Sequence, residues 1–125
     1  MKKQGAVLVL SDGRSFFGKS LGAVGTTSGE VVFTTGMGGY QETLTDPSFC
    51  EQIITFTYSH IGNYGVNGED VECEKVFAKG IIVRDPVDSP SNYRANDNLE
   101  GFLKANRIVG ISNIDTRALT RHIRS

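Results

Sequence analysis

Short apolar and β-branched stretches, separated by glycine, proline and asparagine, occupy most of the chain. Such stretches predict strands, and they fall here at residues 5–10, 14–18, 30–35, 52–58, 78–83 and 108–111. The first stretch is apolar throughout and predicts a buried strand. Ser11-Asp12-Gly13 contains the Asp-Gly pair of a tight turn, so the first two strands are expected to form a hairpin. Residues 21–25 are expected to be a glycine-rich connection.

Helical spacing of apolar residues occurs towards the carboxyl end of the chain. One helix is predicted to begin at Asn98 and a second at Asp115, because both side chains can cap a helix amino terminus. The expected buried positions are Leu99, Phe102 and Leu103 in the first helix, and Leu119 and Ile123 in the second.

Strands that come first and helices that come last favour a β-rich α/β domain over a regularly alternating doubly wound sheet. The length of 125 residues fits a single domain, residues 1–125.

Composition and charge narrow the class of function. The formal net charge of −1 argues against a nucleic-acid-binding protein. Basic residues cluster at Arg117, Arg121, His122 and Arg124, which is typical of a solvated helix face or a partner contact. No apolar run approaches the ~18 residues of a membrane span. Two isolated cysteines and no signal-peptide core predict a cytoplasmic protein.

Residues 13–20, Gly-Arg-Ser-Phe-Phe-Gly-Lys-Ser, match the phosphate-loop pattern G-x-x-x-x-G-K-[ST]. That loop must curl around phosphate groups and lead into a helix. Here Gly13 closes the predicted hairpin, and the glycines after Ser20 disfavour a helix. We therefore expect no nucleotide site around Lys19.

The few cysteines and histidines do not predict a catalytic or metal site. Cys50 and His60 flank a predicted strand that would hold them roughly 20 Å apart. His122 belongs to the last predicted helix, and the spacing of these residues with Cys73 matches no metal-ligand pattern. We expect no catalytic residue, cofactor or metal in this chain.

Asp46-Pro47-Ser48 predicts a turn, because Asp and Ser side chains readily bond nearby backbone N–H groups. Two interpretations of Ser48 stay open on local chemistry. The hydroxyl group either serves the turn or is exposed to meet a polar substrate at a domain boundary.

Read in order along the chain, several motifs resemble the amino-terminal domain of the small subunit of glutamine-dependent carbamoyl-phosphate synthase. They are Leu10-Ser-Asp-Gly13, Phe17-Gly18, Gly29-Glu-Val-Val-Phe33, Gly39-Tyr-Gln-Glu42, Leu44-Thr-Asp-Pro-Ser48, Gln52-Ile53, Thr57-Tyr58, His60-Ile-Gly-Asn-Tyr-Gly65, Ile114-Asp-Thr-Arg117 and Leu119-Thr-Arg121. The resemblance extends from about Ala6 to Arg124. Thr34 and Gly36-Met-Gly38 depart from the residues common in that family.

The resemblance implies a three-layer β/β/α domain of the swivelling type. In that family the small subunit also carries a class I glutaminase domain, which we expect to lie outside this chain. The glutaminase releases ammonia from glutamine, and the large subunit combines it with bicarbonate and ATP to make carbamoyl phosphate for arginine and pyrimidine synthesis.

The resemblance implies a role for one residue. The serine of the family's Thr-Asp-Pro-Ser motif contacts glutamine at the boundary with the glutaminase domain, and this serine corresponds to Ser48. The expected partners are the large subunit, the glutaminase domain and L-glutamine, in a cytoplasmic heterodimer whose ATP and Mg²⁺ belong to the large subunit. This chain alone is expected to be inactive. The alternatives are a stand-alone binding module without a glutaminase, or a nucleotide-binding enzyme that uses Gly18-Lys19-Ser20.

Overall fold

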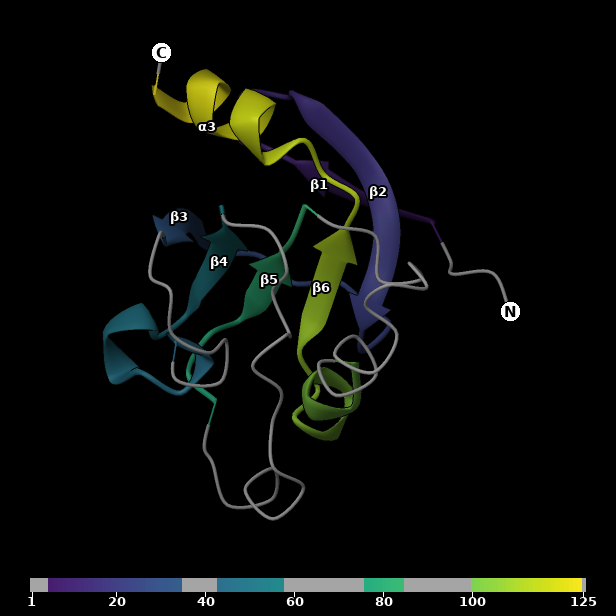
Figure 1. Ribbon diagram of the computed structural model, residues 1–125, viewed down its shortest axis with the longest axis vertical. Helices are drawn as coiled ribbons and strands as arrows, with labels where there is room; N and C mark the ends of the chain where they lie inside the picture. Colours follow the sequence, from purple (N-terminus) through teal and green to yellow (C-terminus); the bar gives the residue numbers. More distant parts are fainter. Residues whose placement is uncertain (1–4, 35–42, 58–75, 85–99, 125) are drawn as a thin grey trace.

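The computed structural model describes residues 5–34, 43–57, 76–84 and 100–124. Six strands form one mixed sheet in the order β1-β2-β6-β5-β4-β3, with β3 to β6 parallel and β1 and β2 antiparallel to their neighbours (Figure 1). The strands are β1 Gly5–Val9, β2 Ser15–Gly22, β3 Glu30–Thr34, β4 Gln52–Phe56, β5 Gly80–Ile82 and β6 Val109–Ser112. The helical segments among the described residues are residues 43–44, the 3₁₀ turn η1 Pro47–Phe49, residues 100–105, and α3 Thr116–Arg124.

The sheet is curved, so that the β1–β2 hairpin lies across one face of the parallel strands. Ala6 and Leu8 of β1 belong to the same apolar cluster as Ile53 of β4 and Ile82 of β5, although β1 and β3 are the two ends of the sheet order. Figure 1 shows the long, bent β2 that makes this possible. The domain is thus a β-rich α/β fold with helices near its carboxyl end, as predicted.

Helix 100–105 covers the opposite face of the parallel strands. Phe102 and Leu103 are 1% and 0% exposed, and they pack in a second cluster with Ile54 and Phe56 of β4 and with Ile81 of β5. Successive strand residues therefore enter different clusters, as the two-residue period of a strand requires. Both faces of the parallel strands are buried, which explains why their sequences are apolar without alternation.

β2 is longer than its sequence pattern predicts. Leu21 and Gly22, expected in a glycine-rich connection, continue the strand and pair with Gly110 and Val109 of β6. The connection prediction was wrong at these two residues because β6, almost ninety residues later in the chain, supplies ladder hydrogen bonds that a local pattern cannot reveal.

The prediction that the first strand is buried was also wrong. Val7 and Val9 are 52% and 60% exposed, and Phe17, opposite Val7 on β2, is 78% exposed. β1 is an edge strand whose inner face packs on the core, whereas its outer face meets no described residue that would bury it. We call Val7, Val9 and Phe17 the outward hairpin face.

The carboxyl-terminal helix α3 begins as predicted. The Ala118 N–H donates to Asp115 Oδ1 at 3.0 Å, which satisfies one of the unpaired donors of the first turn. Leu119 is fully buried, but Ile123 is 38% exposed, so its predicted burial was wrong. The cluster that encloses Leu119 does not extend to the last turn of the helix.

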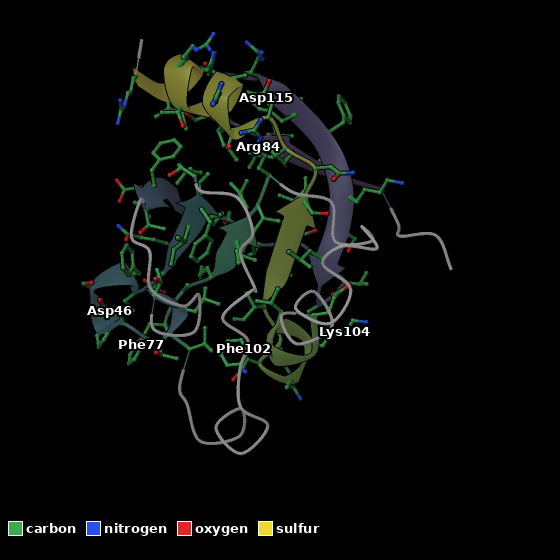
Figure 2. The ribbon with its side chains drawn as sticks, in the orientation of Figure 1. Asp46, Phe77, Arg84, Phe102, Lys104 and Asp115 are labelled. Carbon is green, nitrogen blue, oxygen red and sulfur yellow. The ribbon has the colours of Figure 1, made fainter. Side chains whose placement is uncertain are left out.

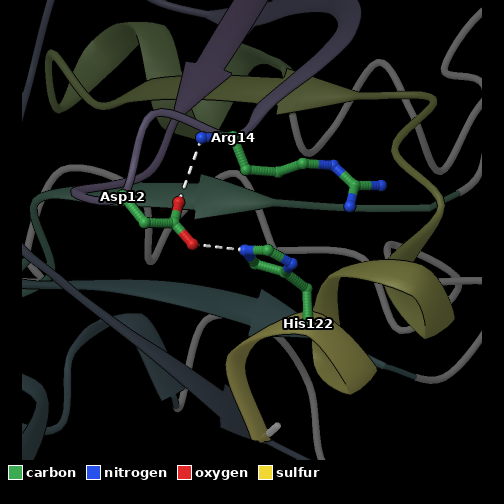
Figure 3. A network of polar contacts seen from close by, with 3 residues as sticks. All are labelled: Asp12, Arg14 and His122. Carbon is green, nitrogen blue, oxygen red and sulfur yellow. Dashed lines mark hydrogen bonds and ion pairs between the residues drawn. The ribbon is translucent and has the colours of Figure 1, made fainter.

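A polar contact ties the last turn of α3 to the hairpin. His122 Nε2 lies 2.6 Å from Asp12 Oδ2, and Asp12 Oδ1 accepts a hydrogen bond from the Arg14 N–H at 3.0 Å (Figure 3). Asp12 therefore stabilises its own turn and connects the two ends of the chain.

Several predictions lie outside the described residues: Asn98, Leu99, and the motifs at 39–42 and 60–65. None of the described helices is long and apolar enough to cross a membrane.

Candidate functional site

Ser48 lies in the 3₁₀ turn η1, which ends three residues before the start of β4. Asp46 caps this turn in an extended conformation, with its Oδ1 accepting a hydrogen bond from the Ser48 N–H at 2.9 Å. Pro47 suits the first position of the turn, because it has no N–H to leave unpaired. The predicted turn is therefore present, and Asp46 determines its shape.

The hydrogen bonds of Ser48 affect the charge of Asp46. The Ser48 backbone N–H, followed by the Ser48 side chain, lowers the pKa of Asp46 below its usual value, because both hydrogen bonds favour the carboxylate form. Asp46, Pro47 and Ser48 are all exposed. The Asp46 carboxylate thus holds the backbone of the turn, and Ser48 remains open to solvent.

Backbone hydrogen bonds hold the segment around Ser48 against the core. The Phe77 N–H donates to the Leu44 carbonyl at 3.0 Å, and the Glu51 N–H donates to the Phe77 carbonyl at 3.0 Å. Leu44 is fully buried. Figure 2 shows Asp46 and Phe77 on the same side of the molecule, away from α3. These contacts fix the exposed turn on both of its sides.

The described residues contain no pairing of a nucleophile with a base. Cys50 is an exposed free thiol that follows η1, whereas His60 and Cys73 lie outside the described residues. His122 contacts Asp12, and no contact between His122 and Cys50 occurs among the described residues. In the described part of the chain, no three His, Cys, Asp or Glu side chains gather as a metal site would require.

The phosphate-loop match at residues 13–20 is coincidental. Gly13 lies in the hairpin turn with a φ of 95°, and Lys19 lies in the middle of β2, paired with Gly5 and Ser112. Gly18 is needed for packing, since a Cβ there would lie 2.1 Å from the Ser112 carbonyl oxygen. A paired strand cannot curl around a phosphate group, so no nucleotide site is formed here.

The outward hairpin face was not predicted from the sequence. The alternation of Ala6 and Leu8 with Val7 and Val9 is apolar on both sides, which indicates a strand with two apolar faces. In a two-stranded hairpin only one of these faces can pack on the domain's own core. The two apolar faces of this strand could therefore have predicted an apolar surface that binds a partner.

Comparison with known proteins gives the family. A sequence profile described as "Carbamoyl-phosphate synthase small chain, CPSase domain" matches residues 8–125. The carbamoyl phosphate synthase small chain of Streptomyces coelicolor is 57% identical over 119 residues, which cover 95% of this chain and 31% of that protein. The small chain of Bifidobacterium longum is 56% identical over 123 residues, covering 98% and 30%.

A third relative, the carbamoyl phosphate synthase small chain of a Synechococcus strain, is 54% identical over 124 residues, covering 99% of this chain and 32% of that protein. This chain thus spans about a third of the length of the curated relatives it matches. The family profile covers nearly all of it. The chain therefore belongs to the carbamoyl-phosphate synthase small chain family and corresponds to its CPSase domain.

Proposed function

We propose that this chain is the amino-terminal domain of the small, glutamine amidotransferase subunit of a carbamoyl-phosphate synthase, and that it serves subunit assembly and glutamine positioning. The observation that carries the proposal is the family match from residue 8 to residue 125, with 57% identity to a small chain. The complete enzyme hydrolyses glutamine and uses the ammonia, with bicarbonate and ATP, to form carbamoyl phosphate. ATP and Mg²⁺ bind to the large subunit in this proposal.

Ser48 is the proposed glutamine contact. Its exposed position, the hydrogen bond from its backbone N–H to Asp46 and the anchoring of the segment through Phe77 support this role. A hydroxyl group carried by a fixed turn can orient a substrate, and small misplacements of a reacting group lower the rate strongly. Ser48 positions glutamine in this proposal, and the nucleophile belongs to the glutaminase domain. The measurement that tests this is the KM for glutamine of an intact enzyme that carries Ser48→Ala.

The chain by itself is proposed to be inactive as a glutaminase. Cys50 is the described thiol that could act as a nucleophile, and no described histidine contacts it. Glutamine turnover by this chain should therefore equal that of the Cys50→Ser variant. A rate that is clearly higher for the unmodified chain would contradict the proposal.

The outward hairpin face supports the assembly role. Val7 and Phe17 lie opposite each other in the hairpin, and Val9 continues the same face. Exposed apolar side chains that adjoin one another are typical of surfaces that bind a partner. We propose that the large subunit covers this face in a cytoplasmic heterodimer that supplies arginine and pyrimidine synthesis.

Calorimetry with the purified large subunit tests the assembly role. The unmodified chain should bind at micromolar concentrations, and Phe17→Ser should weaken binding by about tenfold, because burial of one large side chain contributes about 1.5–3 kcal/mol. Ile123→Ser, at an exposed apolar position on α3, serves as the control. Equal affinities of the two variants would contradict the assignment of this face. A lack of binding by all three chains would favour the alternative, a stand-alone binding module with no glutaminase partner.

A further inference from the structure

A second polar site lies at the opposite end of the sheet from Ser48. A hollow of about 530 Å³ is lined by Arg84, which comes just after β5, and by Arg117 and Arg121 of α3. Ile114 and Ala118 supply its apolar lining. Figure 2 shows Arg84 and Asp115 close to α3, far from Asp46. We call this site the arginine hollow.

The three arginines come from two separate parts of the fold. Arg117 and Arg121 are four residues apart on α3, so they lie on the same face of the helix. Arg84 reaches the same hollow from the carboxyl end of β5, which runs parallel to β6. The hollow thus forms at the carboxyl ends of parallel strands, where α/β folds commonly bind ligands.

The positive charge of the hollow exceeds the negative charge of the described residues that line it. Among the described residues, no carboxylate forms an ion pair or a hydrogen bond with Arg84, Arg117 or Arg121. Asp115, the acidic residue among the described residues that line the hollow, uses its Oδ1 to cap α3 through the Ala118 N–H. In the part of the chain that the structure describes, three guanidinium groups and one carboxylate therefore line the hollow, although the whole chain has a net charge of −1.

We propose that the arginine hollow is an oxyanion-binding site that takes a carboxylate or phosphate group. Guanidinium groups match the geometry of such oxygens in pairs and bind them more strongly than neutral donors do. Arg117 and Arg121 repel each other at their spacing along α3, and a bound anion would relieve that repulsion together with the charge of Arg84. The anion is either a free small molecule or an acidic side chain of a partner protein, and both offer the same chemistry.

The test follows the side-chain Nε–Hε signals of arginine by NMR in the ¹⁵N-labelled chain at low ionic strength. One titration uses inorganic phosphate, and a second uses a tetraglutamate peptide. We expect saturable shifts confined to Arg84, Arg117 and Arg121 with at least one of the two probes. Saturation by phosphate assigns the site to free anions, and saturation by the peptide alone assigns it to a partner's carboxylates.

Two variants make the test specific. Arg84→Gln combined with Arg117→Gln should weaken binding by about tenfold or more, because each removes charge-assisted hydrogen bonds. Arg107→Gln, an exposed arginine at the amino end of β6, should leave binding unchanged. All of these side chains are exposed, and equal melting temperatures would show that the fold is intact. Shifts that do not saturate with either probe, or equal weakening by the control, would overturn the proposal.

Discussion

Gly110 lies in β6 where that strand passes between β2 and β5. A Cβ at this position would lie 2.6 Å from Ile81 Cγ2 and 3.0 Å from the Leu21 carbonyl oxygen. The side chain of alanine therefore has no room unless the neighbouring strands move apart. Gly101, in helix 100–105, provides the opposite case, because nothing lies within 4 Å of its position for a Cβ.

Gly110→Ala is expected to lower the free energy of unfolding by about 1–3 kcal/mol, the usual cost of overpacking. Gly101→Ala is expected to raise it by up to about 1 kcal/mol, because alanine loses less conformational freedom in a helix. Urea denaturation of both variants measures the difference. If Gly110→Ala were as stable as the unmodified chain, β6 would not be packed as closely as described.

Asp12 gives the fold a dependence on pH. The Arg14 backbone N–H, and next the His122 side chain, hold the pKa of Asp12 below its ordinary value of 3.8. A carboxyl group whose pKa is lower in the folded state stabilises the fold above its unfolded pKa, and this contribution is lost as the pH falls through the folded pKa.

Asp12→Asn should therefore lower the melting temperature at pH 5 and above, where the carboxylate contributes fully. The gap between the variant and the unmodified chain should shrink as the pH falls below about 4. Glu51→Gln, at an exposed position, serves as the control and should show no such narrowing. A gap that stayed constant from pH 6 to pH 3 would show that the charge of Asp12 does not stabilise the fold.

At the scale of residues, local chemistry could be predicted and long-range pairing could not. Asp46-Pro47-Ser48 indicated a turn, since the hydrogen bond that forms it joins residues two positions apart. The glutamine contact of Ser48 stays a prediction that depends on the family resemblance. The Asp12–His122 contact joins residues 110 positions apart, and no pattern along the chain records such a pair.

In helix α3, the apolar side chains of one face are buried along only part of the helix. Leu119 is fully buried beside Ile114, while Ile123, one turn further on, is 38% exposed. Spacing along the sequence places both residues on one helix face, but it cannot show where the covering surface ends.

Leu119→Ala should lower the free energy of unfolding by about 2–5 kcal/mol, because it removes buried methyl groups and leaves a cavity. Ile123→Ala should change it by about 0.5 kcal/mol or less, as expected for a surface position. Thermal denaturation of the two variants provides the comparison. Similar losses in both would mean that the last turn of α3 is also buried.

At the scale of elements, the positions of the strands along the sequence were predicted better than their burial and their pairing with other strands. β-branched stretches identified β3, β4, β5 and β6, because a strand's propensity is carried by its own residues. The exposure of β1 and the extension of β2 depend on which other strands lie beside them. Those neighbours are distant in sequence, so local hydrophobicity gave the wrong answer for Val7, and the local glycine pattern gave the wrong answer for Leu21.

At the scale of the whole molecule, two polar regions lie at opposite ends of the parallel strands. The Ser48 turn precedes β4, whereas the arginine hollow follows β5 and β6. The spacing of residues along the sequence did not predict the strand order or the folding of the hairpin over the sheet. The layered architecture was expected from the family resemblance alone. The outward hairpin face and the arginine hollow both depend on which strands lie side by side, so neither was predicted.

The central claim is that this domain positions glutamine for a glutaminase domain and is not itself a catalyst. The most direct test places Ser48→Ala in a complete small subunit assembled with its large subunit, and compares glutamine with ammonia as the nitrogen donor. Loss of a hydrogen bond to the substrate should reduce kcat/KM for glutamine by about tenfold or more, with the ammonia-dependent rate unchanged. Equal rates with glutamine before and after the substitution, or an equal fall with both donors, would contradict the account.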